Sequence, residues 1–376
     1  MTSDPRSLPP ELPPELACLH AGLPAPERET PFGIPPVFAS TYHLQGDPSG
    51  ALFPYGRDAN PTWLALEEAL GALEGGEAVL FPSGMAAAAA ALTPFLQSGD
   101  RVLLPKDGYH AVRHYAESFL ARFGVVVDKR ATRGLEDSNL GGYRIVWVET
   151  PSNPGLELCD IAAVAEKVHK AGNLLVCDNT TMTPLGQRCL ALGADLVVAS
   201  DTKAVNGHSD LLMGHVAARD PALLASLRSW RKLSGSIVGP MEAWLCHRGL
   251  QTLELRFERM CRSAQAVAER FRGHPKLAAL RYPGLPDDPG HALARSQMSR
   301  FGSLVSFTFP DQERALAFES GLGLIFKATS FGGTHSSIDW RYRWDDTVHP
   351  GLLRLSLGCE PTAALLDDLE QAFDRL

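Results

Sequence analysis

The sequence of 376 residues lacks the features of several protein classes. No apolar run approaches the roughly 20 residues of a membrane-spanning helix. The 35 Lys and Arg residues are outnumbered by 43 Asp and Glu residues and form no basic block, which disfavours nucleic acids or membranes as partners. The polar, proline-rich N-terminus lacks the apolar core of a signal peptide. Seven cysteines without a C-x-x-C pair argue against a zinc or disulfide framework, so we expect a cytoplasmic protein with reduced thiols and no metal site.

Three short motifs of common enzyme classes are also missing. The sequence has no H-E-x-x-H, no phosphate-binding Walker loop and no G-x-G-x-x-G after a predicted strand. Apolar residues make up 45% and charged residues 21%, as in an ordinary globular protein, and the length allows two domains. We expect an N-terminal arm at residues 1–55, a larger domain at 56–245 and a smaller domain at 246–376.

Short apolar runs alternate with helical patterns through the larger domain. The strands are predicted at residues 77–81, 101–104, 125–128, 143–148, 174–177 and 196–199. The helices are predicted at residues 61–73, 86–96, 111–123, 161–171 and 187–194. This alternation predicts an α/β protein with a mainly parallel central sheet that has helices on both faces.

The rest of the sequence predicts a smaller α/β unit. Helical patterns at residues 223–233 and 241–270 lead into it. Its own elements are strands at 303–309 and 352–356 and helices at 313–320 and 363–376. Residues 329–349 are rich in Gly, Ser, Trp, Tyr and Arg, and they predict a long loop near a site.

Two predicted strands, 174–177 and 196–199, organise the search for a site. With the helix expected between them they form a strand–helix–strand unit, so the strands should be parallel neighbours. Ligands of such sheets bind at the carboxyl ends of the strands. Asp178 follows the first strand, and residues 200–203, which include Lys203, follow the second. One carboxylate and one lysine should therefore face a single crevice.

A carboxylate and a lysine in one crevice suit pyridoxal phosphate (PLP). Lys203 would form a Schiff base with the PLP aldehyde, helped by a pKa that burial lowers, and Asp178 would keep the ring nitrogen protonated. The hydroxyls of Ser200 and Thr202 could bind the phosphate. Taken singly, a lysine that caps a strand in water and an aspartate that starts a turn are the commoner interpretations. The combination favours PLP.

Two further turns suit the same ligand. Ser83, Gly84 and Met85 stand between a predicted strand and an alanine-rich helix, and free N–H groups at a helix start bind anions. The alternative is an ordinary tight turn. Tyr109 follows the next predicted strand, where it could stack on an aromatic ring or simply pack.

Five motifs occur together along the chain. They are Tyr-Gly-Arg-Asp-Ala-Asn-Pro-Thr at 55–62, Ser-Gly-Met at 83–85, Glu-Thr-Pro-Ser-Asn-Pro at 149–154 with Asp-Asn-Thr at 178–180, Ser-Asp-Thr-Lys at 200–203, and Arg-Leu-Ser-Leu-Gly-Cys-Glu at 354–360. In this combination the sequence resembles the cystathionine γ-synthase/γ-lyase family of PLP enzymes from about Ala17 to its C-terminus. The resemblance implies a fold-type I PLP-dependent transferase with a mainly parallel central sheet and a smaller C-terminal α/β domain.

The resemblance also implies a role for each motif in binding PLP. Lys203 would carry the cofactor, Asp178 would bind the ring nitrogen, and Tyr109 would stack on the ring and act as an acid or base. The phosphate would be bound by Gly84, Met85, Ser200 and Thr202. Tyr55 and Arg57 would reach the same phosphate from a neighbouring subunit. The active sites would then be shared across a dimer, within a homotetramer.

The amino-acid substrate would be bound mainly from the C-terminal domain. By the resemblance, its binding residues are Asn153, Thr329, Ser330 and Arg354. An independent argument supports Arg354, because a planar guanidinium grips a carboxylate in two places. A surface salt bridge is the commoner role of an arginine.

The sequence departs from its relatives at three places. Methionine γ-lyases carry a cysteine where this chain has Ala111, and some cystathionine γ-lyases carry a glutamate before the serine where this chain has Thr329. Many relatives also have a further segment after the position of Gly333. The aromatic and basic run Trp340–Trp344 either rebuilds the substrate entrance or packs at a subunit interface.

We therefore expect γ-elimination on a sulfur amino acid, with cystathionine γ-lyase as the first choice. The alternatives are cystathionine γ-synthase, which replaces the γ substituent of an activated homoserine ester, then cystathionine β-lyase or methionine γ-lyase. A non-catalytic α/β scaffold is the alternative from another class. The retention of Lys203, Asp178, Tyr109 and Arg354 argues against it.

Overall fold

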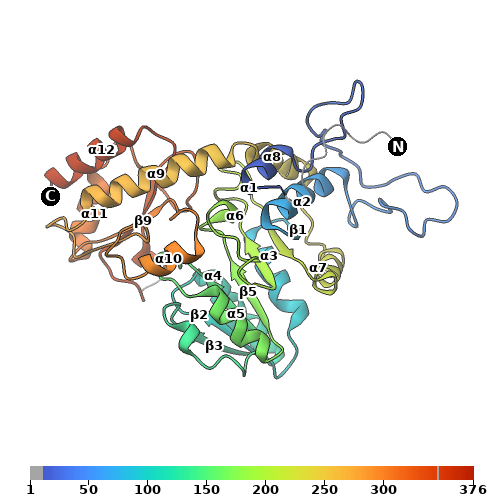
Figure 1. Cartoon of the computed structure of the whole chain (residues 1–376), viewed down its shortest axis with the longest axis horizontal. Helices are drawn as coiled ribbons and strands as arrows, with labels where there is room; N and C mark the ends of the chain where they lie inside the picture. The colour runs from blue at the N-terminus through green and yellow to red at the C-terminus, as the bar shows by residue number, and fades with distance from the viewer. Residues whose placement is uncertain (1–11, 345–346) are drawn as a thin grey trace.

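Two β-sheets organise the computed structural model, which describes residues 12–344 and 347–376 (Figure 1). The larger sheet has seven strands in the order β1-β7-β6-β5-β4-β2-β3. Their bounds are β1 Glu77–Phe81, β2 Arg101–Pro105, β3 Val126–Arg130, β4 Ile145–Glu149, β5 Leu174–Asp178, β6 Leu196–Ala199 and β7 Gly214–Ala218. All run in one direction except β7, which is antiparallel to β1 and β6. The mainly parallel sheet is confirmed, with β7 as a strand that the sequence did not predict.

The larger sheet is buried on both faces. Ile145 and Trp147 of β4 pack into one apolar core, and Val146 and Val148 pack into the other, because successive side chains of a strand point to opposite faces. Helices contribute to both cores. Those in chain order are α1 Pro14–His20, α2 Pro61–Glu74, α3 Gly84–Leu92, α4 His110–Ser118, α5 Ile161–Lys170, α6 Thr183–Gly186, α7 Pro221–Ser234 and α8 Pro240–Leu250.

The connection between β5 and β6 differs from its prediction. The two strands are parallel neighbours, as expected. The helix expected at residues 187–194 is wrong: this segment forms turns, and the connection contains only the short α6. The backbone carbonyl of Gln187 accepts a hydrogen bond from the Asn179 side chain at 2.7 Å, and the Gln187 side chain donates to the Thr150 carbonyl at 2.9 Å. Tertiary hydrogen bonds thus replace helical ones.

The smaller sheet has five strands in the order β10-β11-β12-β9-β8. Their bounds are β8 Ala279–Arg281, β9 Leu304–Thr308, β10 Phe326–Lys327, β11 Ser337–Trp340 and β12 Leu352–Ser356. The helices of this part are α9 Leu253–Phe271, α10 His291–Gln297, α11 Gln312–Gly321 and α12 Thr362–Asp374. The long helix α9 runs from the larger sheet to the smaller one (Figure 1). The continuous helix expected at 241–270 is therefore divided into α8 and α9, and the Arg256 side chain bonds the Gly249 carbonyl at that break.

The long loop expected at residues 329–349 is only partly a loop. It contains β11, which pairs with β12, and the short 3-10 helix η4 (Arg341–Arg343). β11 has only four residues, too few for its alternation to stand out: Ile338 enters the apolar core, whereas Asp339 lies opposite Arg354 in the strand register. Residues 345–346 lie outside the described part.

The N-terminal segment extends away from the two sheets (Figure 1). After α1, residues 21–60 have no regular secondary structure, and the side chains of Phe32 and Phe38 are 90% and 66% exposed. Residues 1–11 of the expected arm lie outside the described part. Within the described part, no helix has the length and apolar character needed to cross a membrane.

Candidate active site

A cavity of about 420 Å³ lies where the carboxyl ends of the parallel strands face the smaller sheet. Glu149, Asp178 and Ser200 line it at the ends of β4, β5 and β6, and Ser330 and Arg354 line it from the other part of the chain. All predicted site residues line this cavity except Tyr55 and Arg57. Those present are Gly84, Met85, Tyr109, Asn153, Asp178, Ser200, Thr202, Lys203, Thr329, Ser330 and Arg354.

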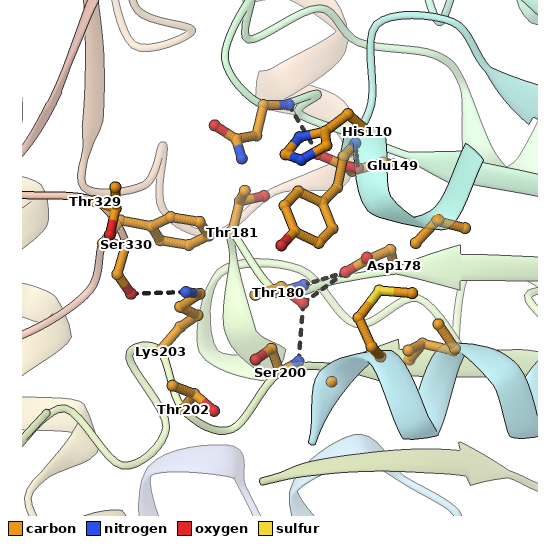
Figure 2. A pocket seen from close by; sticks show the side chains of 18 of the residues that line it. His110, Glu149, Asp178, Thr180, Thr181, Ser200, Thr202, Lys203, Thr329 and Ser330 are labelled. Atoms are coloured by element: carbon orange, nitrogen blue, oxygen red, sulfur yellow. Dashed lines mark hydrogen bonds between the residues drawn. The ribbon is translucent and has the colours of Figure 1, made fainter. Parts of the chain in front are cut away.

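Asp178 is a buried carboxyl held by hydrogen bonds from a single residue. Its Oδ1 accepts from the backbone N of Thr180 at 3.0 Å and from Thr180 Oγ1 at 2.6 Å (Figure 2). Thr180 Oγ1 in turn accepts from the backbone N of Ser200 at 2.9 Å, which ties β5 to β6. Burial raises the pKa of Asp178, and the Thr180 bonds oppose this rise. Among the described residues Oδ2 has no hydrogen bond, so it can accept one from a ligand.

Lys203 lies across the cavity with its amine bonded to one residue from the C-terminal part of the chain. Its Nζ donates to Ser330 Oγ at 2.6 Å and lies 5.2 Å from the centre of the Phe331 ring (Figure 2). Burial, followed by the positive charges of Arg354 and Arg341, lowers the pKa of Lys203 to about 8. A larger neutral fraction near neutral pH makes the amine a better nucleophile and base.

The start of α3 forms the part of the cavity suited to an anion. Ser83 caps the helix through its Oγ, which accepts from the backbone N of Ala86 at 3.0 Å. A Cβ on Gly84 would lie 2.6 Å from Ser200 Cβ, so only glycine lets the helix approach the end of β6 this closely. The first N–H groups of a helix lack intrahelical partners and attract phosphate.

Thr202 lines the same region with a hydroxyl that is already engaged. Its Oγ1 accepts from the backbone N of Met213 at 3.0 Å and donates to the Met213 carbonyl at 3.2 Å. Thr202 therefore ties the loop before Lys203 to the residue that precedes β7. A phosphate bound by this hydroxyl would have to share it with Met213.

Tyr109 is 40% exposed and stands at the N-terminal end of α4. Its backbone N donates to Glu149 Oε2 at 2.6 Å, and the backbone N of Asn153 donates to Glu149 Oε1 at 2.8 Å. Glu149 is also the register partner of Asp178 across β4 and β5. Burial and the neighbouring Asp178 raise the pKa of Glu149 to about 8. Glu149 was not among the predicted site residues, although its place at a strand end beside Asp178 was a usable signal.

Arg354 is buried in the cavity wall and not on the surface. Its Nη1 donates to Asn153 Oδ1 at 2.8 Å, its Nη2 donates to the Ser330 carbonyl, and Nη2 lies 3.5 Å from Asp339 Oδ2. Burial, followed by Arg341, lowers its pKa to about 9, which leaves it charged at neutral pH. Its buried Nε has no hydrogen-bond partner among the described residues. The surface salt bridge considered for Arg354 is therefore excluded, and a free donor points to an anionic ligand.

Tyr55 and Arg57 lie outside the cavity of the single chain. Tyr55 is 43% exposed, and Arg57 Nη1 donates to the Lys232 carbonyl at 3.3 Å. The cavity also contains Phe331, which had no predicted role. Arg341 and Trp344 line it too, and they belong to the run 340–344 that was expected either to rebuild the substrate entrance or to pack at a subunit interface.

The residues present fit PLP. The unpartnered Oδ2 of Asp178 suits a ring N–H, the amine of Lys203 suits the aldehyde, and the close approach of Gly84 to Ser200 leaves the α3 start open to a phosphate. A cavity of about 420 Å³ is within the usual range of about 300–1,000 Å³ for small-molecule sites.

Comparisons with known proteins agree with this fit. The family described as Cys/Met metabolism PLP-dependent enzyme matches residues 17–374. A Streptomyces coelicolor protein provisionally named cystathionine gamma-lyase is 48% identical over 95% of this chain and 92% of its own length. The cystathionine gamma-lyase of Bacillus subtilis is 36% identical over 95% of this chain and 98% of its own. The crystal structure of cystathionine gamma synthase from Xanthomonas oryzae pv. oryzae has a TM-score of 0.92 at 34% identity and covers 97% of this chain and 98% of its own.

Proposed function

The chain belongs to the Cys/Met metabolism PLP-dependent enzyme family, and we propose that it is a cystathionine γ-lyase. In this reaction cystathionine and water give cysteine, 2-oxobutanoate and ammonia. The observation that carries the proposal is the meeting of Lys203, Asp178 and Arg354 in one cavity. The similarity to two cystathionine γ-lyases along nearly the full length supports the choice of substrate.

PLP, Asp178 and Lys203 act together at the reacting carbon of the substrate. PLP, when bound, supplies an aldehyde that links to amines and a protonated pyridine ring that withdraws electrons from the neighbouring carbon. Asp178 Oδ2 holds the proton on the ring nitrogen. Lys203, with a pKa of about 8, removes the proton from Cα of the substrate. The neutral fraction of the amine near that pH makes it an effective base.

Other residues orient the substrate and its leaving group. Arg354 binds the α-carboxylate through its free Nε, beside Asn153, Ser330 and Thr329. Tyr109, whose backbone is anchored by Glu149, would stack on the ring of bound PLP and would give a proton to the departing sulfur. A thiol leaves more readily than a thiolate, so this proton favours cleavage of the Cγ–S bond.

We propose further that Tyr55 and Arg57 serve the cavity of a second copy of the chain. Both lie outside the cavity of their own chain, on a segment with the exposed Phe32 and Phe38. Arg57→Ala should weaken PLP retention. Mixing Arg57→Ala with Lys203→Ala should then restore part of the activity in hybrid dimers, and no recovery would count against shared sites.

Product analysis tests the proposed function. The holoenzyme is offered cystathionine, O-succinylhomoserine with cysteine, and methionine in parallel. We expect cysteine and 2-oxobutanoate from cystathionine as the fastest reaction. Homocysteine and pyruvate would indicate a β-lyase, and cystathionine formed from the ester would indicate a γ-synthase, which the likeness to the Xanthomonas oryzae structure also supports. Faster cleavage of methionine would indicate a methionine γ-lyase. A protein that stays colourless with PLP would favour a non-catalytic scaffold.

A further inference from the structure

Two buried arginines of the cavity wall depend on one carboxylate. Asp339 of β11 is fully buried, and its Oδ2 accepts from Arg341 Nη1 at 2.7 Å and lies 3.5 Å from Arg354 Nη2. Arg343 approaches Oδ1 at 3.2 Å, but its side chain is 40% exposed and lies 3.8 Å from Glu319. Because one carboxylate balances one charge, the pair Arg341 and Arg354 leaves one positive charge in the wall.

The two arginines differ in how much of their guanidinium is engaged. Both Nη atoms of Arg354 donate hydrogen bonds, so Nε is its only nitrogen without one. Arg341 donates through Nη1 alone, and neither its Nε nor its Nη2 has a partner among the described residues. A guanidinium edge with two free donors is the geometry that grips a carboxylate in two places. Arg341 therefore offers the more complete carboxylate site, although it is not the predicted one.

Position along the wall separates the two sites. Arg354 is 2% exposed and contacts Asn153 and Ser330, next to Lys203. Arg341 is 7% exposed and stands three residues before Trp344, a cavity residue that is 47% exposed. Exposure thus increases from Arg354 through Arg341 to Trp344. Because Arg341 and Arg354 approach the same oxygen of Asp339, a substrate whose α-carboxylate binds Arg354 has its far end within reach of Arg341.

We propose that Arg341 binds the distal carboxylate of the substrate and so selects amino acids that carry a second carboxylate at the end of a thioether side chain. This inference rests on the proposed function and deepens it. Arg341 is a specificity-determining residue, and Arg354 remains the site of the α-carboxylate. Cystathionine has such a distal carboxylate, whereas methionine does not.

The test compares two ligands and three variants. Cystathionine is compared with S-(2-aminoethyl)homocysteine, which is cystathionine without the distal carboxylate. Arg341→Met removes the charge, Arg341→Lys keeps the charge without the planar edge, and Arg343→Met is the matched control in the same 3-10 turn. For each protein we measure kcat/KM with the PLP-loaded enzyme and, by calorimetry, the Kd of both ligands for the PLP-free protein.

The expected result is a loss confined to one ligand. In Arg341→Met, kcat/KM and affinity for cystathionine should fall about 10- to 100-fold, as for loss of a charged hydrogen-bonded pair. The values for S-(2-aminoethyl)homocysteine should change little, Arg341→Lys should be intermediate, and Arg343→Met should resemble the native protein.

Other outcomes overturn the inference or separate it from the proposed function. If Arg341→Met weakens binding of both ligands equally, Arg341 acts on the α-carboxylate or on the fold. If neither affinity falls, Arg341 contacts neither ligand. The native protein could bind cystathionine without cleaving it, while Arg341→Met still weakens that binding. The proposed function would then fail and this inference would stand.

Discussion

The two walls of the cavity hold their charges in different ways. At the ends of β4 and β5, Glu149 and Asp178 are bonded to backbone N–H groups and to the Thr180 hydroxyl, with no cation among these partners. On the opposite wall, Arg341 and Arg354 share the single carboxylate of Asp339. The second wall therefore keeps a positive charge, whereas on the first wall burial raises the pKa of both carboxyls. We propose that the first wall receives the cationic ring nitrogen and the second the substrate carboxylates.

Lys203 is where the two walls meet. It belongs to the segment that follows β6, yet its amine bonds Ser330 and its pKa is lowered by burial, Arg354 and Arg341. The cationic wall thus acts on a lysine that the other sheet supplies. From this difference between the walls we predict which substitutions abolish turnover and which change only its rate or its pH dependence.

Removing the lysine should have the largest effect. Lys203→Ala should lower kcat on cystathionine by about 10²- to 10⁴-fold, because the base at Cα is lost. The protein should still bind PLP without a covalent bond, which borohydride treatment followed by denaturing gel filtration would reveal. Full activity in this variant would remove Lys203 from the mechanism.

Neutralising the acidic wall should have the next largest effect. Asp178→Asn keeps an Oδ1 acceptor for Thr180 but removes the charge opposite the ring nitrogen, so kcat should fall about 10²-fold. The Tm of the PLP-free protein should not fall, since burial already disfavours the charged form of Asp178. Asp128→Asn, a change of a carboxyl outside the cavity, is the control. A large loss of Tm with unchanged kcat would make Asp178 a structural residue.

Two variants of Ser330 test how much the hydrogen bond between Ser330 and Lys203 contributes to activity. Ser330 has φ of 75°, a left-handed conformation that glycine adopts more readily than alanine. Both Ser330→Ala and Ser330→Gly remove the partner of Lys203, so kcat/KM should fall by a similar factor of about 3 to 10. Ser330→Gly should be the more stable by about 1 kcal/mol in denaturant unfolding. Equal stabilities would contradict the strained backbone at this position.

The smallest expected effect is a pH shift. The neutral amine of Lys203 attacks the PLP aldehyde, so the rate of PLP addition to the PLP-free protein should rise with pH and level off above about 8. A lysine in water would continue to gain rate up to its ordinary pKa of 10.5. Arg341→Met should move the midpoint upward, because it removes one of the positive charges that lower this pKa. Absorbance after rapid mixing measures the rate, and an unmoved midpoint would show that Arg341 does not act on Lys203.

The sequence alone was sufficient for Asp178 and Lys203 of the cavity, although not for Glu149. Short Val- and Leu-rich runs alternate with helical patterns, and this local signal predicts parallel strands whose carboxyl ends meet at one edge. Asp178 stands directly after one such run and Lys203 stands four residues after the next, so their approach follows from the topology. The turn of Ser83 and Gly84 at a helix start is equally local.

The second wall was decided by the tertiary structure. Lys203 and Ser330 are 127 residues apart in the chain, and Arg354 and Asn153 are 201 apart. Their contacts depend on how the smaller sheet packs against the larger one, which no local periodicity encodes. The same holds for Arg341, which follows β11. This strand has only four residues and gives little local signal, and its pairing with β12 places Asp339 opposite Arg354. Local hydrophobic patterning thus specified where Asp178 and Lys203 lie, and long-range packing specified the residues that face them across the cavity.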